Sequence, residues 1–132
     1  MLATLPGAML VAPVEIDVAR LRSTQGVLRL CLTSDPTNFP ACSDDADALK
    51  RSIPATQRII RFEALPVGAY AAAIIHDENA NRKLDKTLGI PREGFGFSRN
   101  PRIGFGAPRF AAARFAVDGG GADQSITMRY LL

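Results

Sequence analysis

The feature that most constrains the fold is the short period of the apolar residues, which alternate with polar ones in brief runs. The run from Val14 to Val18 shows this clearly, because three apolar residues alternate with two acids. A period of two places the apolar side chains on one face of a half-buried strand. Glycine, proline, asparagine and serine separate the runs, as turns require. Strands are therefore expected at residues 14–18, 27–33, 57–64, 70–75, 110–117 and 123–131.

These runs predict an all-β fold, an antiparallel β-sandwich of the immunoglobulin-like type with about six to seven strands. The first two runs are separated by a short loop, so we expect them to form an antiparallel hairpin. The run at 70–75 is almost continuously apolar and is expected to be central and covered on both faces. One short helix is expected at 43–51, where Ser43 can cap the N-terminus and Lys50 and Arg51 fill the last turn.

Composition limits the domain organisation and the classes of partner. With 132 residues, 47% of them hydrophobic, the chain has the length and the apolar content for one domain with a real core. We expect this domain to span residues 13–132, and residues 1–12 to be a signal-peptide remnant or a disordered terminus. A net charge of +3 without Lys/Arg runs argues against nucleic acid as a partner. No run reaches the roughly 20 apolar residues needed to span a membrane.

Cys31 and Cys42 are the two cysteines of the chain, and they flank a segment that contains Pro36, Asn38 and Pro40. A disulfide between them would close a short loop and stabilise the fold by about 2–3 kcal/mol in the chain-entropy model. Two unrelated thiols in a reducing cell are the alternative. Together with the apolar N-terminus, the pair favours an oxidising compartment, so we expect a secreted or periplasmic protein.

Oxygen-bearing side chains recur at alternate positions after the central run and have the spacing of a calcium loop. The predicted ligands are the side chains of Asp77, Asn79, Asn81 and Asp85 and the carbonyl oxygen of Lys83. The pattern departs from a standard loop, because Arg82 replaces the usual glycine and Leu88 replaces the final glutamate. We therefore expect weak Ca²⁺ binding at most. The alternative is a turn in which these side chains bond their own backbone.

A glycine- and phenylalanine-rich segment follows and is expected to be a long ordered loop. Its phenylalanines would anchor the loop on the sandwich by being mostly buried. Alternatively, rings and guanidinium groups would form a patch that binds a carbohydrate or a peptide. The residues of this patch are Arg92, Phe95, Phe97, Arg99, Arg102 and Phe105.

His76 is the single histidine and precedes Asp77, which raises the possibility of a small hydrolase. A histidine-based nucleophile system needs a serine or cysteine within reach and a third orienting group. Ser98 and Ser125 are present, but neither lies in a nucleophile-elbow motif. The sequence therefore predicts a structural role for His76 and no catalytic residue. One histidine and two paired cysteines do not make a convincing zinc site either.

Three segments together carry a family resemblance: LPVGAY at 65–70, HDENANRKLD at 76–85 and GIPREGFGFSRNP at 89–101. With these segments the chain resembles the bacterial DUF2141 family over about residues 13–132. The resemblance implies a secreted or periplasmic domain with a transthyretin-like β-sandwich and no assigned activity. The expected function is that of a non-enzymatic binding or accessory module for an unknown protein, peptide or carbohydrate.

Overall fold

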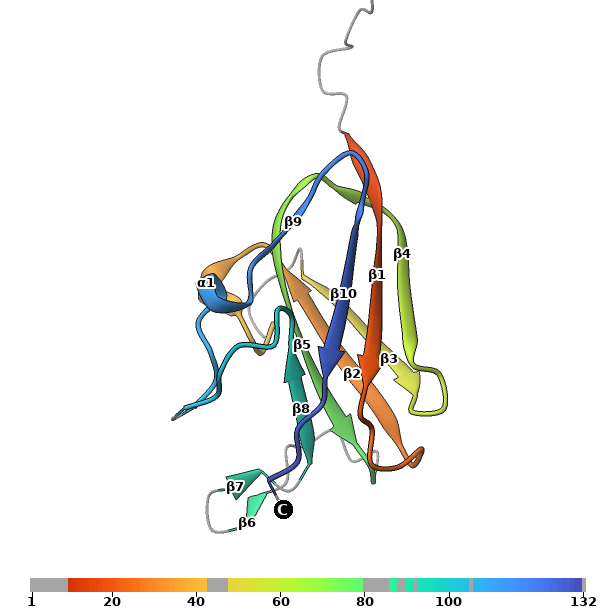
Figure 1. The fold of residues 1–132 in the computed structure, drawn as a ribbon, viewed down its shortest axis with the longest axis vertical. Coiled ribbons are helices and arrows are strands. Elements are labelled where there is room, and N and C mark those ends of the chain that lie inside the picture. The colour runs from red at the N-terminus through yellow and green to blue at the C-terminus, as the bar shows by residue number, and fades with distance from the viewer. Residues whose placement is uncertain are drawn as a thin grey trace, which may run out of the picture.

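The computed structural model describes residues 10–42, 48–79, 86–87, 90–91, 93–104 and 106–131. The chain forms two facing β-sheets, whose strands overlap in the view of Figure 1. The three-stranded sheet has the order β10 (Ala122–Thr127), β1 (Val11–Ala19), β4 (Ile59–Pro66). The five-stranded sheet contains β3 (Leu49–Pro54), β2 (Val27–Thr33), β5 (Gly68–Asp77) and β8 (Gly94–Phe97) in this order, and β9 (Phe115–Val117) also pairs with β5.

Short elements complete the described chain. They are the 3₁₀ turn η1 (Pro36–Asn38), the two-residue strands β6 (Lys86–Thr87) and β7 (Ile90–Pro91), and the helix α1 (Phe110–Ala113). No helix in the described residues is both long and apolar enough to cross a bilayer.

The core lies between the two sheets and is built by the alternation seen in the sequence. Val14, Ile16 and Val18 of β1 are fully buried, and the leucines of β2 face them from the other sheet. Ile60 and Phe62 of β4 and Ile126 of β10 complete the same cluster. The expected all-β sandwich is confirmed.

The pairing of the first two strands differs from the expected hairpin. β1 pairs with β4 and β10, whereas β2 pairs with β3 and β5 in the other sheet. Residues 20–26 carry the chain across the core, and Arg20 and Gly26 at the two ends of this crossing have left-handed backbone angles. The hairpin prediction was wrong because both apolar faces are buried most completely when the strands face each other across the core.

One strand pair also departs from the antiparallel pattern. β10 runs parallel to β1, with Val14 opposite Ala122 and Ala19 opposite Thr127. After β9 the chain crosses the top of the sandwich in Figure 1 and enters β10 at the end where β1 begins. Gly121 allows this crossing, because it has a φ of 88° and its backbone approaches Pro13 too closely for a side chain.

Two expected elements are corrected by the structure. Lys50 and Arg51 were expected in the last turn of a helix but lie in β3, which pairs with β2 along its whole length. Residues 43–47 of the predicted helix are outside the described residues. The strand expected at 110–117 is shorter, because Phe110–Ala113 forms α1 and the strand begins at Phe115. The hydroxyl of Ser98 donates to the carbonyl oxygen of Ala113 and fixes this turn against the sheet.

The glycine- and phenylalanine-rich segment contains a strand where a loop was expected. Gly94–Phe97 forms β8, which pairs with β5 from Ala73 to His76. Its glycines alternate with its phenylalanines, so the glycines face the core and the rings face outward. A side chain at Gly94 would collide with the ring of Tyr130, and one at Gly96 with Ile126.

β5 is central and buried on both faces, as its continuous apolar sequence predicts. Tyr70, Ala72 and Ile74 belong to the main core. Ala71 and Ala73 point to the opposite side of the sheet, where they belong to a second and smaller apolar cluster. This cluster also contains Phe97 and the cysteines.

The tight packing of β8 on the core predicts the effect of adding one methyl group. In Gly96→Ala the new Cβ would lie 2.7 Å from Cγ2 of Ile126, so the free energy of unfolding should fall by about 1–3 kcal/mol. Gly119→Ala is the matched control, since a Cβ at this position would meet no atom within 4 Å. Urea unfolding measures both variants. Equal stability of the two variants would contradict the assigned packing.

Candidate functional site

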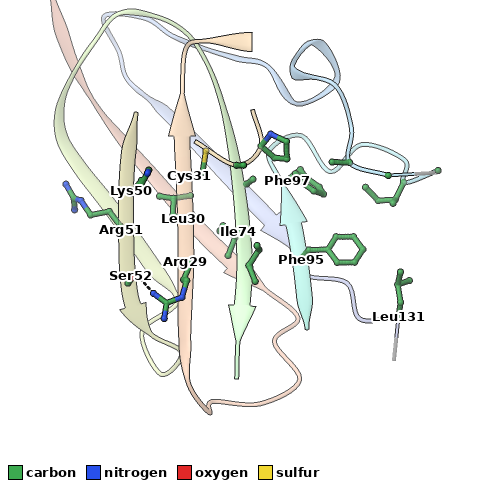
Figure 2. Close-up of a pocket in the computed structure, with 18 residues that line it drawn as sticks. Arg29, Leu30, Cys31, Lys50, Arg51, Ser52, Ile74, Phe95, Phe97 and Leu131 are labelled. Carbon is green, nitrogen blue, oxygen red and sulfur yellow. Dashed lines mark hydrogen bonds between the residues drawn. The ribbon is translucent and has the colours of Figure 1, made fainter. Parts of the chain in front are cut away.

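A broad groove covers the outer face of the five-stranded sheet, on the side away from the main core. It has a volume of about 1010 Å³. Figure 2 shows its floor, which runs from β3 across β2 and β5 to β8. It is bordered at the β8 side by Ile103, Gly104, Gly106, Ala107 and, near the end of the chain, Leu131.

The strand register explains which side chains form the floor. Residues that are paired across neighbouring strands lie on the same face of a sheet. Two rows of such residues cross the groove from β3 to β8. The first row is Ser52, Arg29, Ile75 and Phe95, and the second is Lys50, Cys31, Ala73 and Phe97. The groove is therefore polar and basic over β3 and β2, and apolar over β5 and β8.

The apolar end is formed by two rings that support each other. Phe97 is 8% exposed, and its ring centroid lies 6.0 Å from those of both Phe39 and Phe95. Phe95 is half-buried, so part of its ring faces the groove. Leu131 continues this surface and is 55% exposed. The expected burial of the rings holds for Phe97 and in part for Phe95, and Phe105 is outside the described residues.

The Cys31–Cys42 disulfide is present and confirms the predicted pairing. The two Cα atoms are 5.8 Å apart, within the usual range for such a bond. Cys31 is in the floor, whereas Pro40 and Ala41 line the groove from the segment that follows η1. The disulfide thus attaches this segment to β2 and fixes one wall of the groove.

The basic end is held in place by an ion pair inside the sheet. Arg29 donates from Nε to Oδ2 of Asp77 at 3.0 Å and from Nη1 to the hydroxyl of Ser52 at 2.9 Å. Asp77 is 1% exposed, so the guanidinium group of Arg29 compensates the negative charge of a buried carboxylate. Lys50 is exposed and has no hydrogen bond or ion pair within the described part of the chain. Arg51 points to the sheet edge, where its guanidinium lies over the ring of Phe62.

The structure divides the expected aromatic and arginine patch. Phe95 and Phe97 line the groove, but Arg99 and Arg102 are not among the residues that do. Arg99 lies in the turn after β8, and its backbone N–H donates to Gln124 of β10. Arg92 and Phe105 are outside the described residues.

Sequence reasoning missed the cations that do line the groove, Arg29, Lys50 and Arg51. A signal for Arg29 was present. It stands between Leu28 and Leu30 in a strand whose outer face is otherwise poor in charge, and such an arginine needs a partner on a neighbouring strand. Lys50 was missed because the sequence predicts a helix over its segment.

The predicted calcium ligands are described only in part. Asp77 is buried and bonded to Arg29, whereas Asn79 is exposed. Asn81, Lys83 and Asp85 are outside the described residues. The described part of the chain holds no group of three or more His, Cys, Asp or Glu side chains suited to a metal ion. The calcium site stays a prediction.

His76 lies near the end of β5 and is fully buried, with 0% exposure. Its Nε2 lies 2.8 Å from the carbonyl oxygen of Gln25, which can only accept, so Nε2 carries the proton. In the neutral ring Nδ1 then accepts from the hydroxyl of Tyr130, also at 2.8 Å. The ring thereby ties the crossing between β1 and β2 to the C-terminal segment.

A salt bridge between Arg22 and Glu78 lies near this histidine. Glu78 receives hydrogen bonds from Nε and Nη2 of Arg22 and from the hydroxyl of Ser23. The bonds from Arg22 are the largest cause of a lowered pKa for Glu78, against the opposing effect of burial. The guanidinium group also lies over the ring of Tyr130, 4.5 Å from its centroid. Burial raises the pKa of the Tyr130 phenol.

The lowered pKa of Glu78 predicts how stability depends on pH. A depressed pKa contributes stability above the pKa of the unfolded state, and this contribution is lost as the pH falls through the folded value. Glu78→Gln should therefore lower the free energy of unfolding by about 0.5–1 kcal/mol at pH 7 and by progressively less below about pH 4. Urea unfolding at several pH values measures this. Glu63→Gln is the control, because the Glu63 side chain is 79% exposed and its replacement should change the free energy of unfolding less. A Glu78→Gln difference that grows on acidification would refute the role of the salt bridge.

The calcium prediction is tested by thermal unfolding. If the loop binds Ca²⁺ with a Kd of about 1 mM, 10 mM calcium should stabilise the fold by about 1.4 kcal/mol, which is a few degrees in Tm. Asp85→Ala should abolish the shift, and it is preferred to Asp77→Ala because the latter would also remove the ion pair with Arg29. Identical melting curves in calcium and in EDTA would show that the loop binds no calcium.

Comparison with protein families identifies the family of this chain. Residues 16–126 match the model of a family described as an uncharacterized protein conserved in bacteria (DUF2141). Searches of curated proteins and of solved structures gave no match. The match extends from within β1 to within β10 and includes the described strands that form the floor of the groove. The chain belongs to the DUF2141 family.

Proposed function

We propose that this protein is a non-catalytic binding module that acts outside the cytoplasm and holds its ligand in the groove over the five-stranded sheet. The observation that carries the proposal is the apolar floor of this groove on the outer face of the sheet. The volume of about 1010 Å³ is at the upper end for sites that bind small molecules.

The outer face of the sheet differs from an ordinary solvated face. In antiparallel sheets with one face in water, the outward residues are normally polar. Here Ala71, Ala73 and Ile75 of β5 point outward, and so do both phenylalanines of β8. The segments around η1 and α1 cover one part of this apolar surface, and the groove is the part that they leave open. Exposed apolar surface that is rimmed by polar groups is typical of a binding site.

The chemistry of the lining supports binding rather than catalysis. Among the described residues that line the groove there is no Asp, Glu or His that could act as a general acid or base. His76 is enclosed by Gln25 and Tyr130 and faces the main core. Asp77 is bonded to Arg29 at the edge of the floor.

An extracytoplasmic location is supported by the disulfide, since such bonds persist in oxidising compartments. The disulfide also fixes a wall of the groove, so a reducing compartment would loosen the site.

A carbohydrate or peptide that binds the predicted aromatic and arginine patch is the alternative. The patch shares Phe95 and Phe97 with the groove. It also depends on Arg99 and Arg102, which do not line the groove. Arg99→Gln therefore separates the two proposals. It should leave ligand binding in the groove unchanged and weaken binding to the patch.

The groove is tested with Nile red, an uncharged dye that fluoresces in apolar surroundings. Phe95→Ala should weaken its binding about tenfold, and Leu131→Ser about threefold, because each removes apolar contact area at the β8 end. Ile59→Ser is the matched control, since Ile59 is 48% exposed and lies in the other sheet. Fluorescence titration gives the Kd, and Tm shows that each variant is folded. No dye binding, or equal loss in all three variants, would refute the groove as the site.

A further inference from the structure

We propose that the ligand of the groove is an amphipathic acid, a molecule with an apolar chain or ring system and a single carboxylate-like anion at one end. The anion lies at Lys50, and the apolar body extends across β5 to Phe95, Phe97 and Leu131. This inference rests on the proposed binding function and adds the class and the orientation of the ligand.

The first argument is the separation of polar from apolar side chains along the groove. In the order of the strands, β3 contributes Lys50 and Ser52, and β2 contributes Arg29 beside the disulfide. β5 and β8 then contribute only apolar side chains to the floor. Figure 2 shows the labelled basic residues on β3 and β2 and the labelled rings on β8, at opposite sides of the floor. A ligand that matches this surface has its charge at one end.

The second argument is the sign of the charge. The described residues that line the groove include the basic Arg29, Lys50 and Arg51 and no acidic residue. The carboxylate of Asp77 compensates the charge of Arg29, and Arg51 stacks on Phe62, so among the described lining residues Lys50 supplies the uncompensated charge. The described residues therefore make the field at the β3 end positive, beside a low-dielectric floor. Complementarity of charge favours an anion there and disfavours a cation.

The third argument concerns hydrogen bonds. β2 and β5 are paired on both sides along the floor, so their backbone groups are already bonded. A peptide or a sugar that lay across Ile75 and Phe95 would bury amide or hydroxyl groups without partners, which is unfavourable. An alkyl chain or a ring system carries no such groups. The polar contacts of the ligand are then limited to its head, where Lys50 and Ser52 lie.

The dimensions of the floor set the length of a suitable probe. Three strand spacings separate β3 from β8, and at about 4.8 Å each they give roughly 14 Å. Leu131 extends the apolar surface beyond β8. A saturated chain of about twelve carbons has a comparable length, and it can place its head at Lys50 with its end near the rings.

The test uses three probes that share one chain and differ in charge: dodecanoate, 1-dodecanol and dodecyltrimethylammonium. The two ions are kept below their micelle concentrations and dodecanol below its solubility limit. Displacement of Nile red and isothermal titration calorimetry give their Kd values. Dodecanoate should bind about tenfold more tightly than dodecanol, as expected for one charge-assisted contact. Dodecyltrimethylammonium should bind most weakly.

Lys50→Gln should weaken dodecanoate binding about fivefold to tenfold and leave dodecanol binding unchanged. The matched control is Arg58→Gln, which removes one exposed charge from the turn between β3 and β4 and should change neither Kd. Raising the salt concentration should reduce the preference for dodecanoate in the wild type and have little effect in Lys50→Gln.

The outcomes separate the two proposals. If dodecanol and dodecanoate displace the dye equally, the groove binds apolar molecules but the inferred anion is wrong. If Lys50→Gln and Arg58→Gln have the same effect on dodecanoate, the position of the head group is wrong. If neither the dye nor any of the three probes binds, the groove itself is refuted. A peptide that binds while dodecanoate does not would replace the amphipathic acid as the ligand class.

Discussion

The burial of β5 on both faces is the constraint on which the rest of the structure depends. One face of this strand completes the main core with Ala72 and Ile74, and the other carries Ala71 and Ala73 into the second apolar cluster. A two-layer sandwich buries one face of each sheet, so the second face of β5 needs its own cover. The chain provides this cover with the disulfide-linked segment around η1 and with α1, which Ser98 holds in place. The groove exists because this cover is incomplete.

The same constraint explains the composition of β8. Its inward positions meet the ring of Tyr130 and the side chains of Ile126 and Met128, which leave no room for a Cβ atom. Glycine at these positions lets the strand lie close to the core, and phenylalanine at the alternate positions supplies the outer cluster with large rings. The motif from which a long ordered loop was predicted is therefore a strand in part, with no side chains on its inner face and large rings on its outer face.

What the sequence could predict follows from the range of the interactions concerned. The period of two located the main strands and the core faces of β1, β2 and β4, because alternation is a local property of the chain. It could not decide that β1 and β2 face each other across the core, since pairing depends on contacts between distant segments. The phenylalanines of the site could be identified from their spacing. The Arg29–Asp77 pair could not, because its members are 48 positions apart and meet only through the register of β2 with β5.

The polar interactions of His76 and Asp77, at the end of β5, help to hold the groove in shape. His76 holds the hydroxyl of Tyr130, and the backbone of the preceding residue, Arg129, pairs with Phe95. Because side chains alternate along an extended segment, Tyr130 is directed to the core side and Leu131 lines the groove. A similar alternation separates the last two residues of β5, His76 and Asp77, which point to opposite faces of the sheet. His76 faces the core, and Asp77 faces outward to fix Arg29 in the floor. The two consecutive residues that first suggested a catalytic pair thus fix opposite ends of the groove, one through the C-terminal segment and the other through β2.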